Sequence, residues 1–263
     1  MEIKVRAIRD ICKYWEYMIY AAKSRLKAEV ANSYLSWIWW VLEPFCYMLI
    51  YTVIFGYIFQ SAEEYFPIYI FIGNTMWGFF SKTISSSVTM IRGNETIIAK
   101  VYLPKYVLVI TEMMVNGFKM LVAFGLTAVM MVVFRVPVSI KLFWILPTMM
   151  VFFLITFGIA TVLMHYGVYI NDLAHVISIA LNVVMYFTGI FFSIETRVPK
   201  PYSDILGIGN PVAFLLTSTR KAVIYNENPY VIVLFVWFVV AIVIDAIAIN
   251  IIYKNENNYV KII

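Results

Sequence analysis

Long apolar segments separated by short polar ones occupy most of this chain. Most of these segments carry the roughly 20 residues that a helix needs to cross a bilayer. They cover residues 37–60, 66–91, 106–134, 142–165, 174–193 and 229–253. The pattern predicts an all-α integral membrane protein with six transmembrane helices, in which residues 36–263 form one transmembrane domain.

The N-terminal segment, residues 1–35, has a different pattern. At the angular spacing of an α-helix, Lys13 and Lys27 fall in one polar arc, whereas Met18 lies largely on the other side. Arg25 is an exception, because it lies on the apolar side. The segment predicts an amphipathic helix in the cytoplasmic headgroup layer. The alternative is a short soluble helix of a cytosolic tail.

The connection before the last span, residues 194–228, is also unusual. It begins with a turn-like stretch around Pro199 and Pro201. Residues 212–225 are then apolar, but they are too few to cross a bilayer. We expect a re-entrant or half-buried helix pair on the outer face. The alternative is an extracellular loop with a hydrophobic patch.

Composition agrees with a membrane protein and excludes a soluble one. The chain is 63% hydrophobic and only 13% charged, whereas soluble domains carry roughly 25% charged residues. The net charge of +5 reflects topology rather than nucleic-acid binding. With the N-terminus inside, the inner segments hold twelve lysines and arginines and the outer ones hold six. This bias places both termini in the cytoplasm.

Four ionisable residues lie within predicted spans, and such residues are functional candidates by default. They are Lys82, Glu112, Lys119 and Asp245. We expect Glu112 to pair with Lys82 or Lys119, because an unpaired charge at that depth is costly. The sequence leaves open whether these charges are structural or take part in transport.

Two stripes of side chains recur at helical spacing in the first two spans. The second span carries a polar stripe, which must face protein or water; it consists of Asn74, Gly78, Ser81, Lys82, Ser85 and Thr89. Helix packing and a lumen face explain it equally well. The first span carries an aromatic stripe, which contacts lipid or lines a sugar conduit. It consists of Trp40, Tyr47, Tyr51 and Phe55.

The motifs of common enzymes do not occur. The sequence has no Gly-Lys dipeptide and hence no P-loop, and it contains neither G-x-S-x-G nor H-E-x-x-H. Its two cysteines and two histidines are isolated, which predicts no metal site. We therefore expect no catalytic residue and no cofactor on this chain. If ATP is used, another chain must bind it.

Three blocks of sequence resemble one known family. The first block, residues 34–56, begins Tyr-Leu-Ser-Trp-Ile-Trp-Trp-Val-Leu-Glu-Pro-Phe and ends Tyr51-Thr52-Val53-Ile54-Phe55-Gly56. It resembles the first span of ABC-2 type polysaccharide export permeases, the membrane subunits of O-antigen, capsule and teichoic acid exporters. The inner stretch after the second span and the outer segment before the last span are also similar. Their matching residues are Asn94, Ile97, Ile98, Lys100, Tyr102 and Pro104, and then Asn210, Pro211 and Arg220.

The resemblance implies a half-transporter in a bacterial cytoplasmic (inner) membrane. Two copies would line one pore and pair with two ATPase subunits, which would hold ATP and Mg. The substrate would be a lipid-linked polysaccharide, such as an O antigen, a teichoic acid or a capsule. Membrane lipid would surround the complex.

Two segments receive roles on this basis. We expect residues 94–101 to dock into the ATPase as a short helix that Asn94 caps, with an apolar contact surface and a polar rim. The apolar residues are Ile97, Ile98 and Val101, and the rim is Lys100. Asn210, Pro211 and Arg220 are expected to close the exit of the conduit as an outer gate.

Two other functions stay open at this stage. One is an ABC-2 permease that exports a drug or a small lipid, which fewer aromatic residues in the lumen would favour. The other is an integral membrane enzyme that modifies glycans. That enzyme would need paired carboxylates or a nucleophile–base pair in an outer loop, and the outer acids Glu195, Asp204 and Glu227 show no such arrangement.

Overall fold

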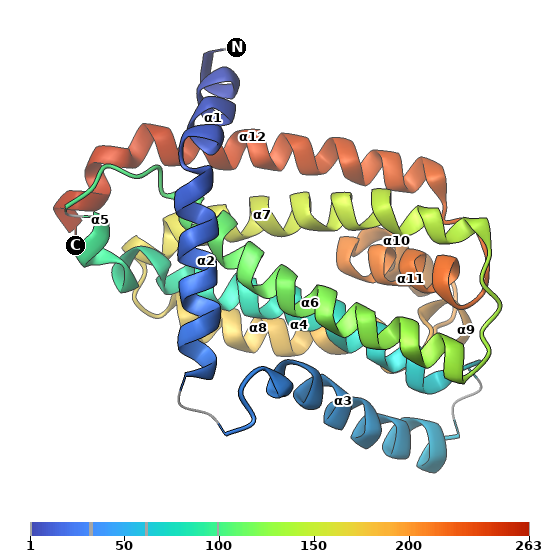
Figure 1. Ribbon diagram of the computed structural model, residues 1–263. Coiled ribbons are helices and arrows are strands. Elements are labelled where there is room, and N and C mark those ends of the chain that lie inside the picture. Colours follow the sequence, from blue (N-terminus) through green and yellow to red (C-terminus); the bar gives the residue numbers. More distant parts are fainter. Residues whose placement is uncertain (1, 32–33, 61–62, 99, 263) are drawn as a thin grey trace.

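The computed structural model describes residues 2–31, 34–60, 63–98 and 100–262, and every regular element within these ranges is a helix. Four long helices lie side by side and form the body of the molecule (Figure 1). They are α4 (Phe66–Gly93), α6 (Tyr106–Val133), α7 (Ile145–Tyr169) and α12 (Val231–Ile262). The predicted all-α architecture is therefore confirmed for the described residues.

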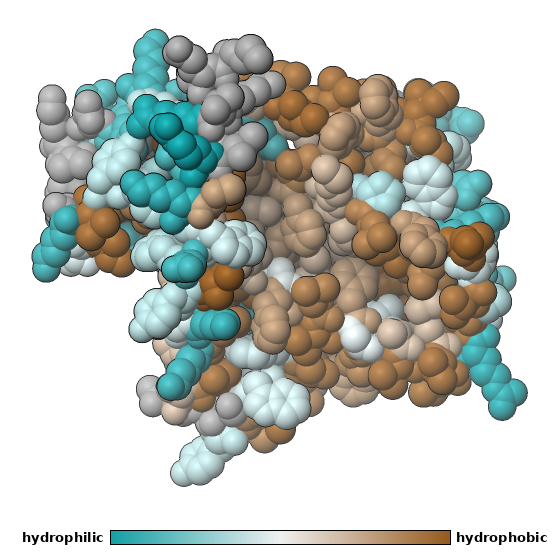
Figure 2. Space-filling model, turned by 45° about the horizontal axis from the view of Figure 1, so that its top comes forward, coloured by the Kyte–Doolittle hydropathy of each residue, from teal (hydrophilic) through white to brown (hydrophobic). Residues whose placement is uncertain are grey.

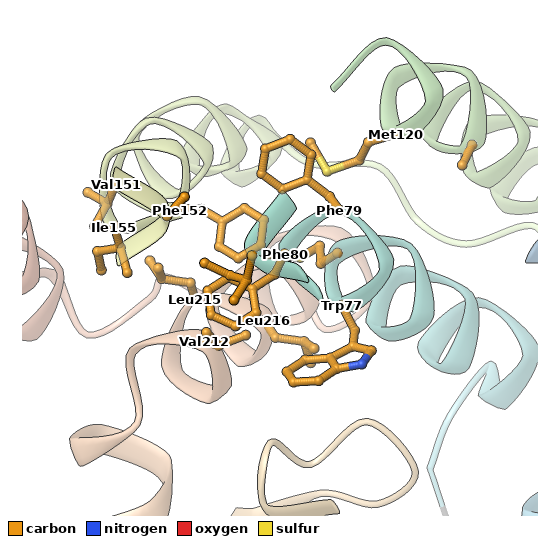
Figure 3. Packing of buried hydrophobic residues seen from close by; sticks show 14 of the residues in the cluster. Trp77, Phe79, Phe80, Met120, Val151, Phe152, Ile155, Val212, Leu215 and Leu216 are labelled. Carbon is orange, nitrogen blue, oxygen red and sulfur yellow. The ribbon is translucent and has the colours of Figure 1, made fainter. Parts of the chain in front are cut away.

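The core lies where α4 and α7 meet α11 (Pro211–Val223). Figure 3 shows Phe79 and Phe80 of α4 against Phe152 of α7, with Leu215 and Leu216 of α11 completing the cluster. The rings of Phe79 and Phe152 lie 5.5 Å apart. Lipid tails are as apolar as these side chains, so the gain comes from close packing rather than from escape from water.

A very close approach joins α4 and α7 near their other ends. A Cβ atom added to Gly167 of α7 would overlap the backbone of Val88 in α4. The Nη2 atom of Arg92 donates a hydrogen bond to the carbonyl of Val168 at 2.7 Å in the same region. A small residue permits this contact between backbones, as in many membrane helix pairs.

Within the described ranges, four segments are long and apolar enough to cross a membrane. They cover Trp39–Ile58, Tyr106–Val133, Ile140–Tyr169 and Val231–Glu256. A broad apolar band between polar ends is visible on the face in Figure 2. The segment α4 is also 28 residues long, but it carries the polar stripe. The predicted count of six spans stays a prediction.

The fifth predicted span is shorter than expected. We predicted residues 174–193, but α8 runs from Leu173 to Phe187 and has 15 residues. Gly189 then adopts a left-handed conformation with a φ of 69°, which an α-helix cannot contain. The apolar residues that follow Gly189 turn back into the core, and Ile190 is buried.

The connections gather at the two ends of the bundle. At one end, Lys141 donates to the carbonyl of Asn226 at 2.8 Å, and the Tyr225 hydroxyl donates to Glu63 at 2.7 Å. All four residues belong to predicted outer connections. The predicted inner connections meet at the other end through Arg92 and Val168.

The N-terminal segment forms two consecutive helices, α1 (Glu2–Lys13) and α2 (Trp15–Val30). They cross the long helices instead of running along them (Figure 1). Met18 and Ala22 of α2 are buried, and this face packs on α6. The predicted helix is present, whereas its place in the headgroup layer stays a prediction.

The first span lies at the edge of the bundle (Figure 1). It consists of a 3₁₀ turn (Ser36–Ile38), α3 (Trp39–Tyr51) and a π-helical segment (Thr52–Ile58). Among the residues of this stretch whose burial is described, Met48 alone is buried. The helix α3 packs on α4 and, less extensively, on α6.

The remaining elements are short and lie at the two ends. At the predicted outer end are a 3₁₀ segment (Ile140–Trp144), α9 (Ile194–Arg197) and α10 (Tyr202–Gly209), which packs beside α11. At the predicted inner end is α5 (Glu95–Ile98). The helix pair α10–α11 agrees with the predicted outer pair, and its re-entrant position relative to the bilayer stays a prediction.

Candidate functional site

A cavity of about 470 Å³ lies between α3 and the α4–α6 pair. A second space of about 440 Å³ adjoins it. The two spaces share Glu29, Ser81, Lys82, Asn116 and Lys119 in their walls. They therefore form one continuous hollow, which we call the polar cavity.

The polar stripe of α4 forms one wall of this cavity. Spacing at three and four residues brings these side chains to one face of the helix. Asn74, Gly78, Ser81, Lys82 and Ser85 all line it. The sixth member, Thr89, is exposed outside the cavity.

The aromatic stripe of the first span divides into two groups. Trp40 and Tyr47 line the polar cavity, and 46% of the Tyr47 side-chain surface is exposed. Tyr51 and Phe55 instead pack on Phe191, with ring centroids 4.9 and 4.6 Å away. The cavity gains three rings that the stripe did not include, Trp39, Trp77 and Phe79.

Glu112 does not pair with either predicted lysine. It accepts a hydrogen bond from Arg25 at 2.6 Å, and a second one from Asn116 at 3.3 Å. Arg25 comes from α2, on the face that packs against α6. Our expectation was wrong because it considered only charges within spans, whereas the crossing helix supplies the partner.

The two intramembrane lysines have other partners. Lys119 pairs with Glu29 at 2.6 Å, and Lys82 pairs with Glu43 at 3.4 Å. Glu29 belongs to α2 and Glu43 to α3. The ion pairs therefore connect both peripheral helices to the central α4–α6 pair.

Asp245 lies apart from the polar cavity. It is 9% exposed in the contact between α12 and α7, where a Cβ atom on Gly158 would overlap its carboxyl oxygen. Among the described atoms its Oδ1 has no hydrogen-bond partner. The structure thus separates Asp245 from the three other intramembrane charges.

The inner segment differs from the expected coupling helix at two residues. Ile97 and Val101 are 40% and 55% exposed and Lys100 is also exposed, whereas Ile98 is only 5% exposed and belongs to the core. Asn94 does not cap α5 with its side chain. It donates to the Met90 carbonyl at 2.7 Å and accepts from Arg25 at 3.3 Å.

Tyr102 fixes this inner segment to both ends of the chain. Its hydroxyl accepts from Arg6 at 2.9 Å and donates to Glu256 at 3.0 Å, while Tyr14 donates to its carbonyl. The adjacent Lys105 is 2% exposed, and burial lowers the pKa of its ammonium group. The chain just after residues 94–101 is thus held by α1, by α12 and by the junction between α1 and α2.

The residues assigned to an outer gate are engaged in contacts within the chain, and of the three only Arg220 is buried. Asn210 accepts from the backbone amides of Val212 and Ala213, so it caps α11, and Pro211 occupies the first turn. Arg220 is 2% exposed and lies 3.4 Å from the ring centroid of Tyr69. These positions stabilise the outer segment and lie outside the polar cavity.

The guanidinium of Arg220 donates only to backbone carbonyls. Its acceptors are Tyr69 at 2.9 and 3.1 Å, Gly189 at 2.7 Å and Ile190 at 2.9 Å. Gly73 provides the space, since a Cβ atom there would overlap Nη2. One side chain therefore ties α11 to α4 and to the turn after α8.

Comparisons with known proteins give a consistent result, although no protein-family model matches the chain. An O-antigen export system permease protein RfbA from Myxococcus xanthus is 25% identical over 228 residues, which is 85% of this chain and 86% of the relative. Two proteins of that name from Klebsiella pneumoniae are 21% and 22% identical, over 95% and 79% of this chain and 95% and 80% of their own lengths.

These likenesses confirm the resemblance to ABC-2 type polysaccharide export permeases. Together with the long apolar helices, they identify a multi-pass membrane protein. The permease names also indicate a transport subunit rather than an enzyme.

Three residues that form the ion pairs of the polar cavity were not predicted from the sequence: Arg25, Glu29 and Glu43. One signal for the first was present. Arg25 broke the amphipathic pattern by lying on the apolar side with Met18, and a charge on a packing face requires a partner. Glu29 lies four residues further on, so it falls on nearly the same face. Glu43 gave no comparable signal.

The Arg25–Glu112 pair predicts a non-additive mutational effect. Arg25→Gln or Glu112→Gln alone should lower stability by about 2 kcal/mol, because each leaves a partly buried charge without its partner. The double variant should lose less than the sum of the two. Thermal unfolding of the four proteins in detergent measures the coupling. Strict additivity would contradict the pairing.

Proposed function

We propose that this chain is the transmembrane subunit of an ABC exporter that carries a lipid-linked polysaccharide across the bacterial cytoplasmic membrane. Two copies would form the pore, and two separate ATPase subunits would bind ATP and Mg. The names of the relatives support polysaccharide export. The lack of a P-loop supports a separate ATPase.

The polar cavity is the observation that carries this proposal. Amides, hydroxyls and charges line it on α4 and α6, and Trp39, Trp40, Tyr47 and Trp77 supply aromatic faces. Sugars bind to such walls with their hydroxyls and with their apolar C–H faces. A polymer that must slide needs many weak contacts, which stacked rings provide. A drug or small-lipid exporter would need less of this polar lining.

The two ends of the helix bundle support the same proposal. At the inner end, Ile97 and Val101 offer an exposed apolar surface where an ATPase would dock. At the outer end, α10 and α11 would lie over the exit of the conduit. Their packing against the core suggests that closure involves the pair as a unit, since Arg220 and Asn210 are engaged inside the chain.

Removing the cavity rings tests the proposal. Trp40→Ala together with Tyr47→Ala should reduce polysaccharide export by about tenfold or more, because two stacking surfaces are lost at about 1 kcal/mol each. Protein level and basal ATP hydrolysis by the complex should persist. Export is measured as surface polymer in cells that carry the variant as their sole copy.

Tyr57 provides a matched control on the same span. It is 84% exposed and lines neither part of the polar cavity. Tyr57→Ala should therefore leave export unchanged. Normal export by the Trp40/Tyr47 variant would contradict the conduit and would favour the drug or small-lipid alternative.

A further inference from the structure

The charges in the wall of the polar cavity balance one another. The wall contains three carboxylates, on Glu29, Glu43 and Glu112, and two ammonium groups, on Lys82 and Lys119. The guanidinium of Arg25 lies against Glu112 and supplies the third positive charge. The formal charge of the group is therefore zero.

Each positive charge is matched at short range by a carboxylate from another helix. The nitrogen–oxygen distances are 2.6 Å for Arg25–Glu112, 2.6 Å for Lys119–Glu29 and 3.4 Å for Lys82–Glu43. An anionic ligand would have to displace a carboxylate from its cation. It would also leave that carboxylate unmatched in a membrane interior, where charges are poorly solvated.

The other groups in the wall are neutral and suit hydroxyl-bearing ligands. Asn74 and Asn116 supply amides, and Ser81 supplies a hydroxyl group. Trp39, Trp40, Tyr47 and Trp77 supply aromatic faces. None of these groups requires a ligand to carry charge.

We propose that the repeating units which pass through the polar cavity are uncharged sugars, and that polymers with a phosphate on every unit are excluded. This inference rests on the proposed function and narrows its substrate to neutral glycans. The wall selects against polyanions because binding one would leave a carboxylate unmatched, and such a cost to the wrong ligand gives specificity.

Two sets of substitutions test the role of the glutamates. Glu29→Gln with Glu43→Gln leaves Lys82 and Lys119 unmatched, so this variant should gain affinity for a phosphate-bearing polymer. The matched control adds Lys82→Gln and Lys119→Gln. It restores a balanced wall and should lose that gain.

Binding can be followed by tryptophan fluorescence, because Trp39, Trp40 and Trp77 lie in the wall. The full chain in lipid nanodiscs is titrated with a linear neutral hexose oligosaccharide and with a glycerol-phosphate oligomer of equal length. The unmodified chain should bind the neutral oligomer at least about tenfold more tightly. The Glu29/Glu43 variant should bind the phosphate oligomer at least about tenfold better than the unmodified chain does, and salt should weaken that gain.

The outcomes separate this inference from the proposed function. Equal or tighter binding of the glycerol-phosphate oligomer by the unmodified chain overturns the charge inference and leaves glycan export intact. Failure of both oligomers to bind, while an amphiphilic drug quenches the fluorescence, overturns both. If the glutamine variants do not fold, the preference of the unmodified chain decides the matter alone.

Discussion

Replacing Arg220 by glutamine is expected to prevent the chain from reaching a stable folded state. The guanidinium is 2% exposed and donates to three backbone carbonyls that lie on two different segments. Glutamine cannot reach all three, so buried acceptors lose their donors. The loss should be about 3–5 kcal/mol, as for other buried charged groups that lose partners. Thermal unfolding in detergent and the yield of monodisperse protein measure it.

Two companion variants make this prediction specific. Arg197→Gln changes an exposed arginine on α9 and should leave stability unchanged. Arg220→Lys keeps the positive charge but lacks the planar fork, so it should be intermediate. An unfolding midpoint of Arg220→Gln equal to that of Arg197→Gln would show that the contacts contribute little.

The second large effect is expected at the predicted inner end of the helix bundle. Ile97→Asp combined with Val101→Asp should abolish export by separating the chain from its ATPase. Both side chains are exposed, so the chain should still insert and fold. Loss of two apolar contacts of about 2 kcal/mol each would weaken association by hundreds-fold. Co-purification of the ATPase with the tagged chain measures this loss.

Ile98 must be left intact in this experiment, because it is buried and its change to Asp would unfold the segment. Ile140→Asp is a suitable control, since Ile140 is 82% exposed at the opposite end of the bundle. It should leave ATPase association unchanged. Retained association in the Ile97/Val101 variant would move the docking surface elsewhere.

Much of the fold follows from the sequence, because apolar segments of membrane length must form helices to satisfy their backbone groups. The boundaries depend on local chemistry and were less predictable. The Asn210–Pro211 pair signals a helix start, and the structure begins α11 there. The end of α8 depends on the left-handed backbone at Gly189, which an apolar sequence conceals.

The site was less predictable, since it depends on how helices are rotated against one another. The aromatic stripe was drawn with α-helical spacing throughout. The structure has a π-helical segment from Thr52 to Ile58, where more residues fill each turn. Tyr51, the last residue of α3, already packs on Phe191 together with Phe55, so the stripe leaves the cavity before the π-helical segment begins. The position of Phe191 after α8 decides this, and spacing within the span does not give it.

Partners between helices were the least predictable feature. Periodicity gives the face on which Lys119 lies, but it does not say which helix covers that face. The crossing of α2 over α6 brings Glu29 to it. In the sequence, only Arg25, a charge on the apolar side of the predicted helix, indicated that another helix covers this face.

The polar cavity has one stiff wall and one compliant wall. α4 is fixed to α7 by the backbone contact at Gly167 and to α11 through Arg220. α3 buries little of its surface and reaches Lys82 only through the partly exposed Glu43. We therefore expect the width of the cavity to depend on the displacement of α3 rather than on movements within the bundle. A polymer whose width varies because of its branches could then pass while the rest of the protein keeps its conformation.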